Sequence, residues 1–79
     1  MTRDDLIRIF NEAKENKQDI CIEVTIPNQE DTEYIINKNK SIDNKLDYYC
    51  KAYDNNLVHS MNDRIRIVNI YAIDFYLGD

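Results

Sequence analysis

The sequence predicts an α+β fold in which two helices pack against an antiparallel sheet of three or four strands. Three observations support this prediction: two stretches with apolar residues at helical spacing, one stretch of strict apolar and polar alternation, and a short polar segment between two extended runs. The predicted order is α-β-β-α-β, or α-β-β-α-β-β if residues 57–60 pair with the sheet. Because 79 residues suit one small domain, we expect a single domain over residues 1–79.

The first predicted helix spans residues 3–17. Thr2 can accept a hydrogen bond from the first turn, and Asp5 can return one to the Thr2 backbone, as in a capping box. Apolar residues then recur at i, i+3, i+4 and i+7, a stripe formed by Leu6, Ile9, Phe10 and Ala13. We therefore expect this helix to bury one face.

The clearest predicted strand spans residues 20–26, where four aliphatic side chains alternate with other residues. Pro27 ends this run, and we interpret residues 27–31 as a polar turn. A second extended run covers residues 32–37. At this separation an antiparallel hairpin is the simplest interpretation.

The second predicted helix spans residues 42–54, with Ser41 as its N-cap. Its apolar face is formed by Ile42, Leu46, Tyr49 and Tyr53, with Cys50 beside it. Residues 57–60 form either a short edge strand or a packed loop. The last extended run covers residues 64–75, and its alternation is broken at Ile67 and Val68, which predicts a β-bulge or a change of partner.

The acidic residues are unevenly distributed along the chain. The net charge is −5, and all of it lies in residues 1–37, which contain four basic and nine acidic residues. An acidic chain is a poor electrostatic ligand for nucleic acid, but it can attract a basic protein surface. We therefore expect a protein partner and no direct nucleic-acid binding, although solubility alone also explains such a charge.

The residue types that carry chemistry are scarce. A single glycine excludes a glycine-rich phosphate loop, and one histidine with two cysteines is a small catalytic repertoire. We therefore expect no enzymatic activity, no catalytic residue, no metal site and no cofactor. His59 is interpreted as a surface residue in a turn, and Cys21 and Cys50 as packing residues. No apolar run suits a membrane span and no signal peptide is recognised, so a cytoplasmic location with reduced thiols is expected.

Three groups of residues are candidate binding surfaces. The first is an acidic hairpin tip, which could offer carboxylates to basic side chains of a partner and is otherwise an ordinary polar turn. It consists of Gln29, Glu30, Asp31 and Glu33. The second is a pocket for an anion or nucleotide, whose arginines could instead pair with acidic residues such as Asp63 and Asp74. It consists of Arg64, Arg66, Tyr48 and Tyr49.

The third candidate surface is the apolar run over residues 70–77, which exceeds what one small core needs. Either it packs beneath the second helix or it meets another copy of the chain, and we expect a homodimer. The residues assigned to this interface are Ile70, Tyr71, Ile73 and Phe75.

Several short segments carry a resemblance to a known family. They are Asp5-Leu6-Ile7-Arg8, the run Asn28-Gln29-Glu30-Asp31-Thr32-Glu33-Tyr34-Ile35-Ile36, and Ser41-Ile42 followed by Lys45-Leu46. In this order, within residues 1–50, they resemble the small acidic phage and prophage anti-CRISPR proteins that inhibit type II CRISPR nucleases by mimicking DNA. The resemblance implies an α-β-β-β-α-α fold and contact between the hairpin turn, at Gln29, Glu30 and Asp31, and the basic PAM-reading surface of the nuclease.

The function expected from these observations is that of a non-enzymatic phage or prophage accessory protein. It would inhibit a bacterial defence system of the CRISPR type by binding a host defence protein through its acidic surface. Two alternatives remain open: a homo-oligomer that sequesters a nucleotide immune signal in the arginine and tyrosine pocket, and a phage assembly adaptor that uses the apolar run.

Overall fold

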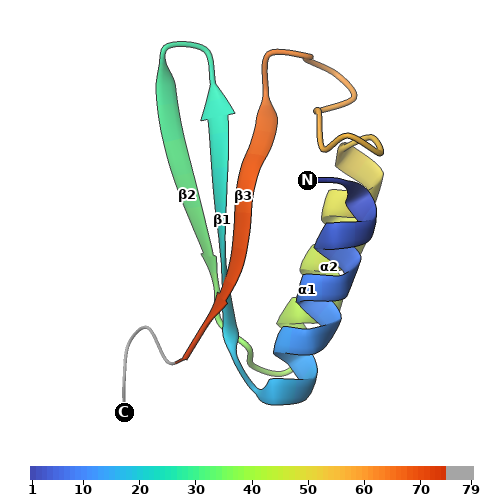
Figure 1. Ribbon diagram of the computed structural model, residues 1–79, viewed down its shortest axis with the longest axis vertical. Coiled ribbons are helices and arrows are strands. Elements are labelled where there is room, and N and C mark those ends of the chain that lie inside the picture. Colours follow the sequence, from blue (N-terminus) through green and yellow to red (C-terminus); the bar gives the residue numbers. More distant parts are fainter. Residues whose placement is uncertain (75–79) are drawn as a thin grey trace.

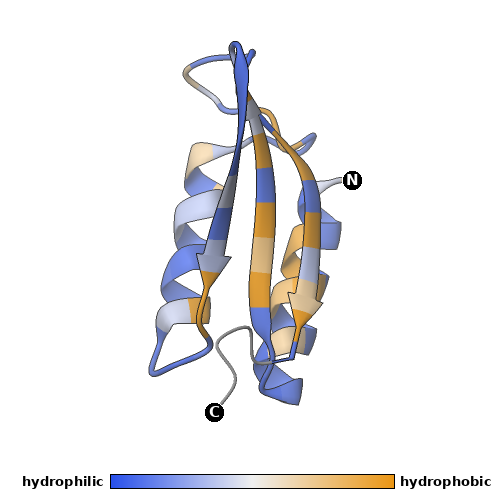
Figure 2. Ribbon diagram, turned by 90° about the vertical axis from the view of Figure 1, so that its left-hand side faces the viewer, coloured by the Kyte–Doolittle hydropathy of each residue, from blue (hydrophilic) through white to orange (hydrophobic). Residues whose placement is uncertain are grey.

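The computed structural model describes residues 1–74 and confirms the predicted α+β fold (Figure 1). The elements are α1 (Arg3–Asn16), β1 (Asp19–Ile26), β2 (Gln29–Ile35), α2 (Ser41–Ala52) and β3 (Arg66–Ile73). Both helices lie against the same face of the sheet (Figure 1, Figure 2). Neither helix of the described residues has the length and apolar character that crossing a membrane requires.

The sheet has three antiparallel strands in the order β2-β1-β3, so β1 is the central strand. Residues 57–60 form no strand; they form a packed loop that touches its neighbours through the isolated bridges Tyr53↔His59 and Val58↔Arg66. The order α-β-β-α-β differs from the one that the family resemblance implies, because β3 follows α2.

The turn between β1 and β2 is shorter than the sequence analysis predicts. Pairing continues to Ile26↔Gln29, so Pro27 and Asn28 alone reverse the chain. Asn28 has a φ of 69°, and a proline followed by a left-handed residue meets the requirement of a type II turn. Residues 29–31 therefore belong to β2 and not to a loop, which corrects the predicted turn over residues 27–31.

A β-bulge in β3 confirms the predicted break in its alternation. Glu23 pairs with Asn69 and Val24 pairs with Ile67, so Val68 is the extra residue. Without the bulge, Ile67 and Ile70 would point to opposite faces of the sheet. With it, both are buried, at 5% and 2% exposure.

The core lies between the helices and the sheet. It includes Leu6, Phe10 and Ala13 of α1, Ile20 and Ile22 of β1, Ile35 of β2, Ile42 and Tyr49 of α2, and Tyr53, Leu57, Ile67 and Ile70. Figure 2 shows hydrophobic residues along β1 and β3, whereas β2 is hydrophilic over most of its length. The turn end of the hairpin, which extends beyond the helices, therefore has little apolar surface to bury (Figure 1).

The two helices begin differently. Thr2 and Asp5 form the predicted capping box at α1. At α2 the predicted N-cap is wrong, because Ser41 is already helical and the cap position is Lys40. The Ser41 hydroxyl instead donates to the Ile36 carbonyl and accepts from the Lys38 N–H, so it secures the segment that enters the helix.

Candidate functional site

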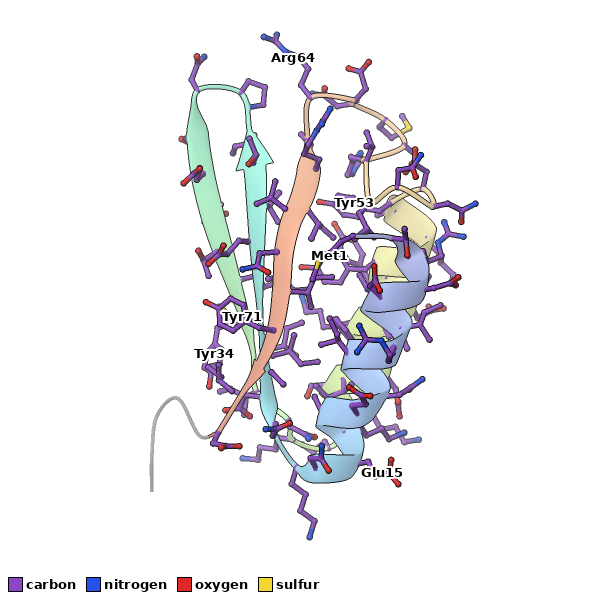
Figure 3. All side chains as sticks on the ribbon, in the orientation of Figure 1. Met1, Glu15, Tyr34, Tyr53, Arg64 and Tyr71 are labelled. Atoms are coloured by element: carbon purple, nitrogen blue, oxygen red, sulfur yellow. The ribbon has the colours of Figure 1, made fainter. Side chains whose placement is uncertain are left out.

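A hollow in the described surface lies between the hairpin and the C-terminal half of α2 with the loop that follows it. It encloses about 560 Å³ and is bordered by Val24, Ile26, Thr32, Tyr34 and Ile65 in addition to six polar or aromatic residues. We name this hollow the tyrosine groove after its polar and aromatic residues: Asp31, Glu33, Tyr48, Tyr49, Tyr53 and His59. Tyr53 lies between the end of α2 and the sheet (Figure 3).

Strand register places two carboxylates in the tyrosine groove. Residues directly opposite each other in an antiparallel pair have side chains on the same face. Asp31 is opposite Val24 and Glu33 is opposite the buried Ile22, so both acidic side chains face the helices. Glu30 is opposite Thr25 and points to the other face. The predicted acidic tip is therefore divided between the two faces of β2 and is not a loop.

Aromatic rings connect the tyrosine groove to the core. Tyr49 has its ring centroid 6.2 Å from that of Phe10 and 5.6 Å from that of Tyr53. The Tyr53 ring in turn meets the His59 ring edge-on, at 5.1 Å. Tyr49 is almost fully buried, whereas Tyr48, on the adjoining face of α2, is 52% exposed. The groove thus has a packed floor at Tyr49 and Tyr53 and an exposed ring, that of Tyr48, at its margin.

One cation of the chain itself lies at the edge of the groove. The Lys45 Nζ is 2.6 Å from a Glu33 carboxylate oxygen and 5.8 Å from the centroid of the Tyr48 ring. Asp31 forms no ion pair with any residue in the range 1–74, and its Oδ1 accepts only the neighbouring Thr32 N–H, at 2.9 Å. Burial is the main cause that raises the pKa of Tyr53, with Tyr48 and the Glu33 carboxylate adding to it. Its hydroxyl therefore stays protonated and can donate.

The loop after α2 holds His59 against the groove. The Asp54 carboxylate accepts the N–H groups of Asn56 and Val58, at 2.8 and 3.0 Å. Leu57 is almost fully buried although its φ is 62°, a left-handed conformation that is costly for this residue. His59 Nδ1 accepts the Met61 N–H at 3.0 Å, which leaves Nε2 as the ring nitrogen that carries a proton.

The backbone bonds to Asp54 predict how the loop responds to pH. They are the main cause that lowers the pKa of Asp54 below its usual 3.8. A carboxyl whose pKa is lowered in the folded state stabilises that state above its usual pKa, and the stabilisation is lost as the pH falls through the lowered value. We therefore expect Asp54→Ala to lower the melting temperature at pH 7, and the difference from wild type to shrink below about pH 4.

Circular dichroism melts at pH 7, 5, 4 and 3 measure this difference. Asp63→Ala is the matched control, because Asp63 is exposed in the same loop and its carboxylate makes no hydrogen bond to a residue of the described chain. A melting-temperature deficit for Asp54→Ala that stays constant from pH 7 to pH 3 would contradict the prediction.

The structure does not assemble the predicted anion pocket. Arg64 is in an exposed turn and extends away from the protein (Figure 3), and Arg66 is opposite Thr25, so it points to the face without helices. Neither lines the tyrosine groove, and neither forms an ion pair with a described residue. Tyr48 and Tyr49 instead share the groove with Asp31 and Glu33, whose carboxylates would repel a phosphate.

The residues of the predicted oligomer interface also do not form one surface. Ile70 is in the core, which corrects its assignment to a surface. Tyr71 lies on the opposite face, where its hydroxyl donates to Glu23 at 3.3 Å. Hydrogen bonding to Cys21, reinforced by the Glu23 carboxylate, raises the pKa of Tyr71 to about 12. Ile73 is half-buried beside Asp19, and Phe75 lies outside the described residues.

Sequence reasoning missed the tyrosine groove, although its signals were present. Asp31 and Glu33 are two apart on a strand, which places them on one face. Tyr49 is on α2, and Tyr53, which the sequence analysis places in the helix, follows its last residue in an extended conformation. Their meeting depends on the short turn and on the packing of α2. Within residues 1–74, no group of three or more histidine, cysteine or acidic side chains could hold a metal ion.

No protein-family model, curated protein sequence or solved structure significantly matches this chain.

Proposed function

We propose that this chain is a non-enzymatic phage or prophage accessory protein that inhibits a host defence protein of the CRISPR nuclease type. It would act in the cytoplasm of the host cell, by binding a basic surface of that protein through the exposed carboxylates of β2. The family resemblance of residues 1–50 motivates the choice of target, and the charges of the hairpin support the mode of binding.

The proposal depends on the exposure and ion pairing of the Glu30 and Asp31 carboxylates. Five carboxylates of the described chain form ion pairs, namely those of Asp5, Glu12, Glu33, Asp43 and Asp47. Glu30 and Asp31 are exposed neighbours near the turn, and neither forms an ion pair with a residue in the range 1–74. Unpaired acidic groups at a projecting edge can pair with arginine or lysine of a partner without first breaking an internal ion pair.

The geometry of β2 indicates how such a partner would approach. β2 is an edge strand, and Glu30 and Asp31 point to its opposite faces. A basic surface that surrounds this edge could contact both carboxylates at once. Pairing with a further strand is less suitable, because Asp31 Oδ1 already accepts the Thr32 N–H at the edge. The binding is therefore attributed to side chains and not to strand addition.

Loss of both charges tests this proposal. With the purified type II nuclease–guide complex of the host strain, wild-type protein is expected to bind and to block cleavage of target DNA. Glu30→Gln/Asp31→Asn should weaken binding by about five- to thirtyfold, because each exposed charge pair contributes up to about 1 kcal/mol. Biolayer interferometry measures the dissociation constant, and a cleavage assay measures inhibition.

The matched control is Glu12→Gln/Glu15→Gln, which removes the same charge from α1. Glu15 lies at the end of the molecule opposite the hairpin turn (Figure 3), so this variant should inhibit like the wild type. Absence of binding by the wild type, or full inhibition by Glu30→Gln/Asp31→Asn, would refute the proposal.

A further inference from the structure

We infer that the tyrosine groove binds a guanidinium group, namely an arginine side chain of the partner, between Asp31 and the exposed ring of Tyr48. The inference rests on the proposed function and deepens it, because it names the side chain that the partner inserts.

The groove has the size and lining that an inserted side chain requires. Its volume of about 560 Å³ lies within the usual range of ligand pockets, about 300–1,000 Å³. Its floor is packed, since Tyr49 and Tyr53 are 3% and 6% exposed. Its margin provides one accessible aromatic face at Tyr48 and one carboxylate, that of Asp31, without an ion pair in the described chain.

The chain itself places a cation in this environment. Lys45 reaches from α2 to Glu33 on β2, and its ammonium lies near the Tyr48 ring. This arrangement combines a carboxylate with the negative face of an aromatic ring, the two groups that stabilise a cation at a protein surface. Glu33 is thereby occupied, whereas the Asp31 carboxylate two residues away remains available.

Guanidinium fits the remaining space better than other groups. Its planar fork can bind a carboxylate through two parallel hydrogen bonds while its face stacks on an aromatic ring, which a compact ammonium cannot do. A phosphate would be repelled by Asp31 and Glu33. A neutral group would leave Asp31 desolvated without a charged partner, which is costly.

Replacement of Lys45 tests the inference, because a purely structural role for Lys45 does not predict tighter binding of a cation. Its positive charge competes with an incoming cation for Glu33 and Tyr48. Lys45→Met keeps the aliphatic stem and removes this competitor. The variant should therefore bind guanidinium more tightly, although it loses an internal ion pair.

The experiment is a titration of the ¹⁵N-labelled full chain, followed by amide chemical shifts. The ligands are the capped peptides acetyl-Gly-Arg-Gly-amide, its lysine analogue and its citrulline analogue, which has the shape of arginine without the charge. We expect saturable shifts at residues 31–33, 48–53 and 59 with the arginine peptide. The lysine peptide should bind several-fold more weakly, and the citrulline peptide at least about tenfold more weakly.

Three variants and one control complete the test. Asp31→Asn and Tyr48→Ala should each weaken arginine binding by about five- to tenfold, and Lys45→Met should strengthen it by about threefold or more. Asp47→Asn is the matched control, because Asp47 is on α2 and paired with Lys51 outside the tyrosine groove, and it should leave the affinity unchanged. The amide spectrum of each variant reports whether it is folded.

Equal binding of the arginine and citrulline peptides, or weaker arginine binding by folded Lys45→Met, would overturn the inference. The proposed function can fail separately, since a groove that binds arginine in a protein that does not inhibit the nuclease refutes only the latter. Conversely, full inhibition by Tyr48→Ala, with inhibition lost in Glu30→Gln/Asp31→Asn, would refute the groove as an anchor and retain the acidic edge.

Discussion

Replacement of Phe10 by alanine is expected to remove most of the stability of this protein. Phe10 is fully buried in α1, and its ring packs edge-on against Tyr49 of α2 while the helix lies on the sheet. Truncation of a buried phenylalanine costs about 3–5 kcal/mol, which includes the cavity that remains. A domain of this length has a total stability of only about 4–12 kcal/mol. At the lower end of this range, the loss of stability is about as large as the total stability.

Urea unfolding followed by circular dichroism measures the effect, and the midpoint should fall by more than about 2 M. Arg8→Ala is the control on the same helix, because Arg8 is exposed and its ion pairs with Asp5 and Glu12 are both 3.5 Å long. That variant should change stability by no more than about 0.5 kcal/mol. A midpoint shift below about 1 M for Phe10→Ala would show that the packing of Phe10 on α1 contributes little to the stability of the core.

Ile70→Asp is expected to unfold the monomer and not to dissociate a dimer. Ile70 is 2% exposed and lies opposite Ile22 in the central strand, beneath the helices. An aspartate there would lose apolar burial and place a carboxylate without a cation in the core, at a cost of about 4 kcal/mol or more. The far-ultraviolet circular dichroism signal and the thermal transition should both be lost.

Val68→Asp is the matched control two residues earlier in β3. Val68 is the bulged residue and is 50% exposed, so the same type of substitution should cost about 1 kcal/mol or less. Size-exclusion chromatography with light scattering distinguishes the two interpretations of Ile70. If the wild type were a dimer and Ile70→Asp a folded monomer, the prediction would be contradicted and Ile70 would belong to an oligomer interface.

Both helices and the central strand could be predicted because their signals are local. The α1 stripe, the Thr2 cap and the alternation in β1 each depend on residues within a few positions of one another. The bulge in β3 could also be predicted, because two adjacent apolar residues at Ile67 and Val68 break the alternation of the strand.

The predicted hairpin turn is too long because a polar composition alone does not distinguish a loop from an exposed strand. Residues 29–31 are polar, yet they pair with Ile26, Thr25 and Val24. These residues are exposed, and the turn end of the hairpin extends beyond the helices (Figure 1), so this part of β2 needs no apolar side chain. Polar residues are therefore compatible with a strand wherever nothing covers the sheet, and pattern alone does not separate the two cases.

The amino-acid sequence alone was sufficient for the fold class, the order of elements and the acidic character of residues 1–37. The tertiary structure was needed to place Asp31 and Glu33 beside the tyrosines of α2, to separate Arg64 and Arg66 from them, and to bury Ile70. The physical reason is that helix and strand periodicity arises between near neighbours. A groove between β2 and α2, in contrast, depends on strand register and helix packing, which join residues that are far apart in the chain.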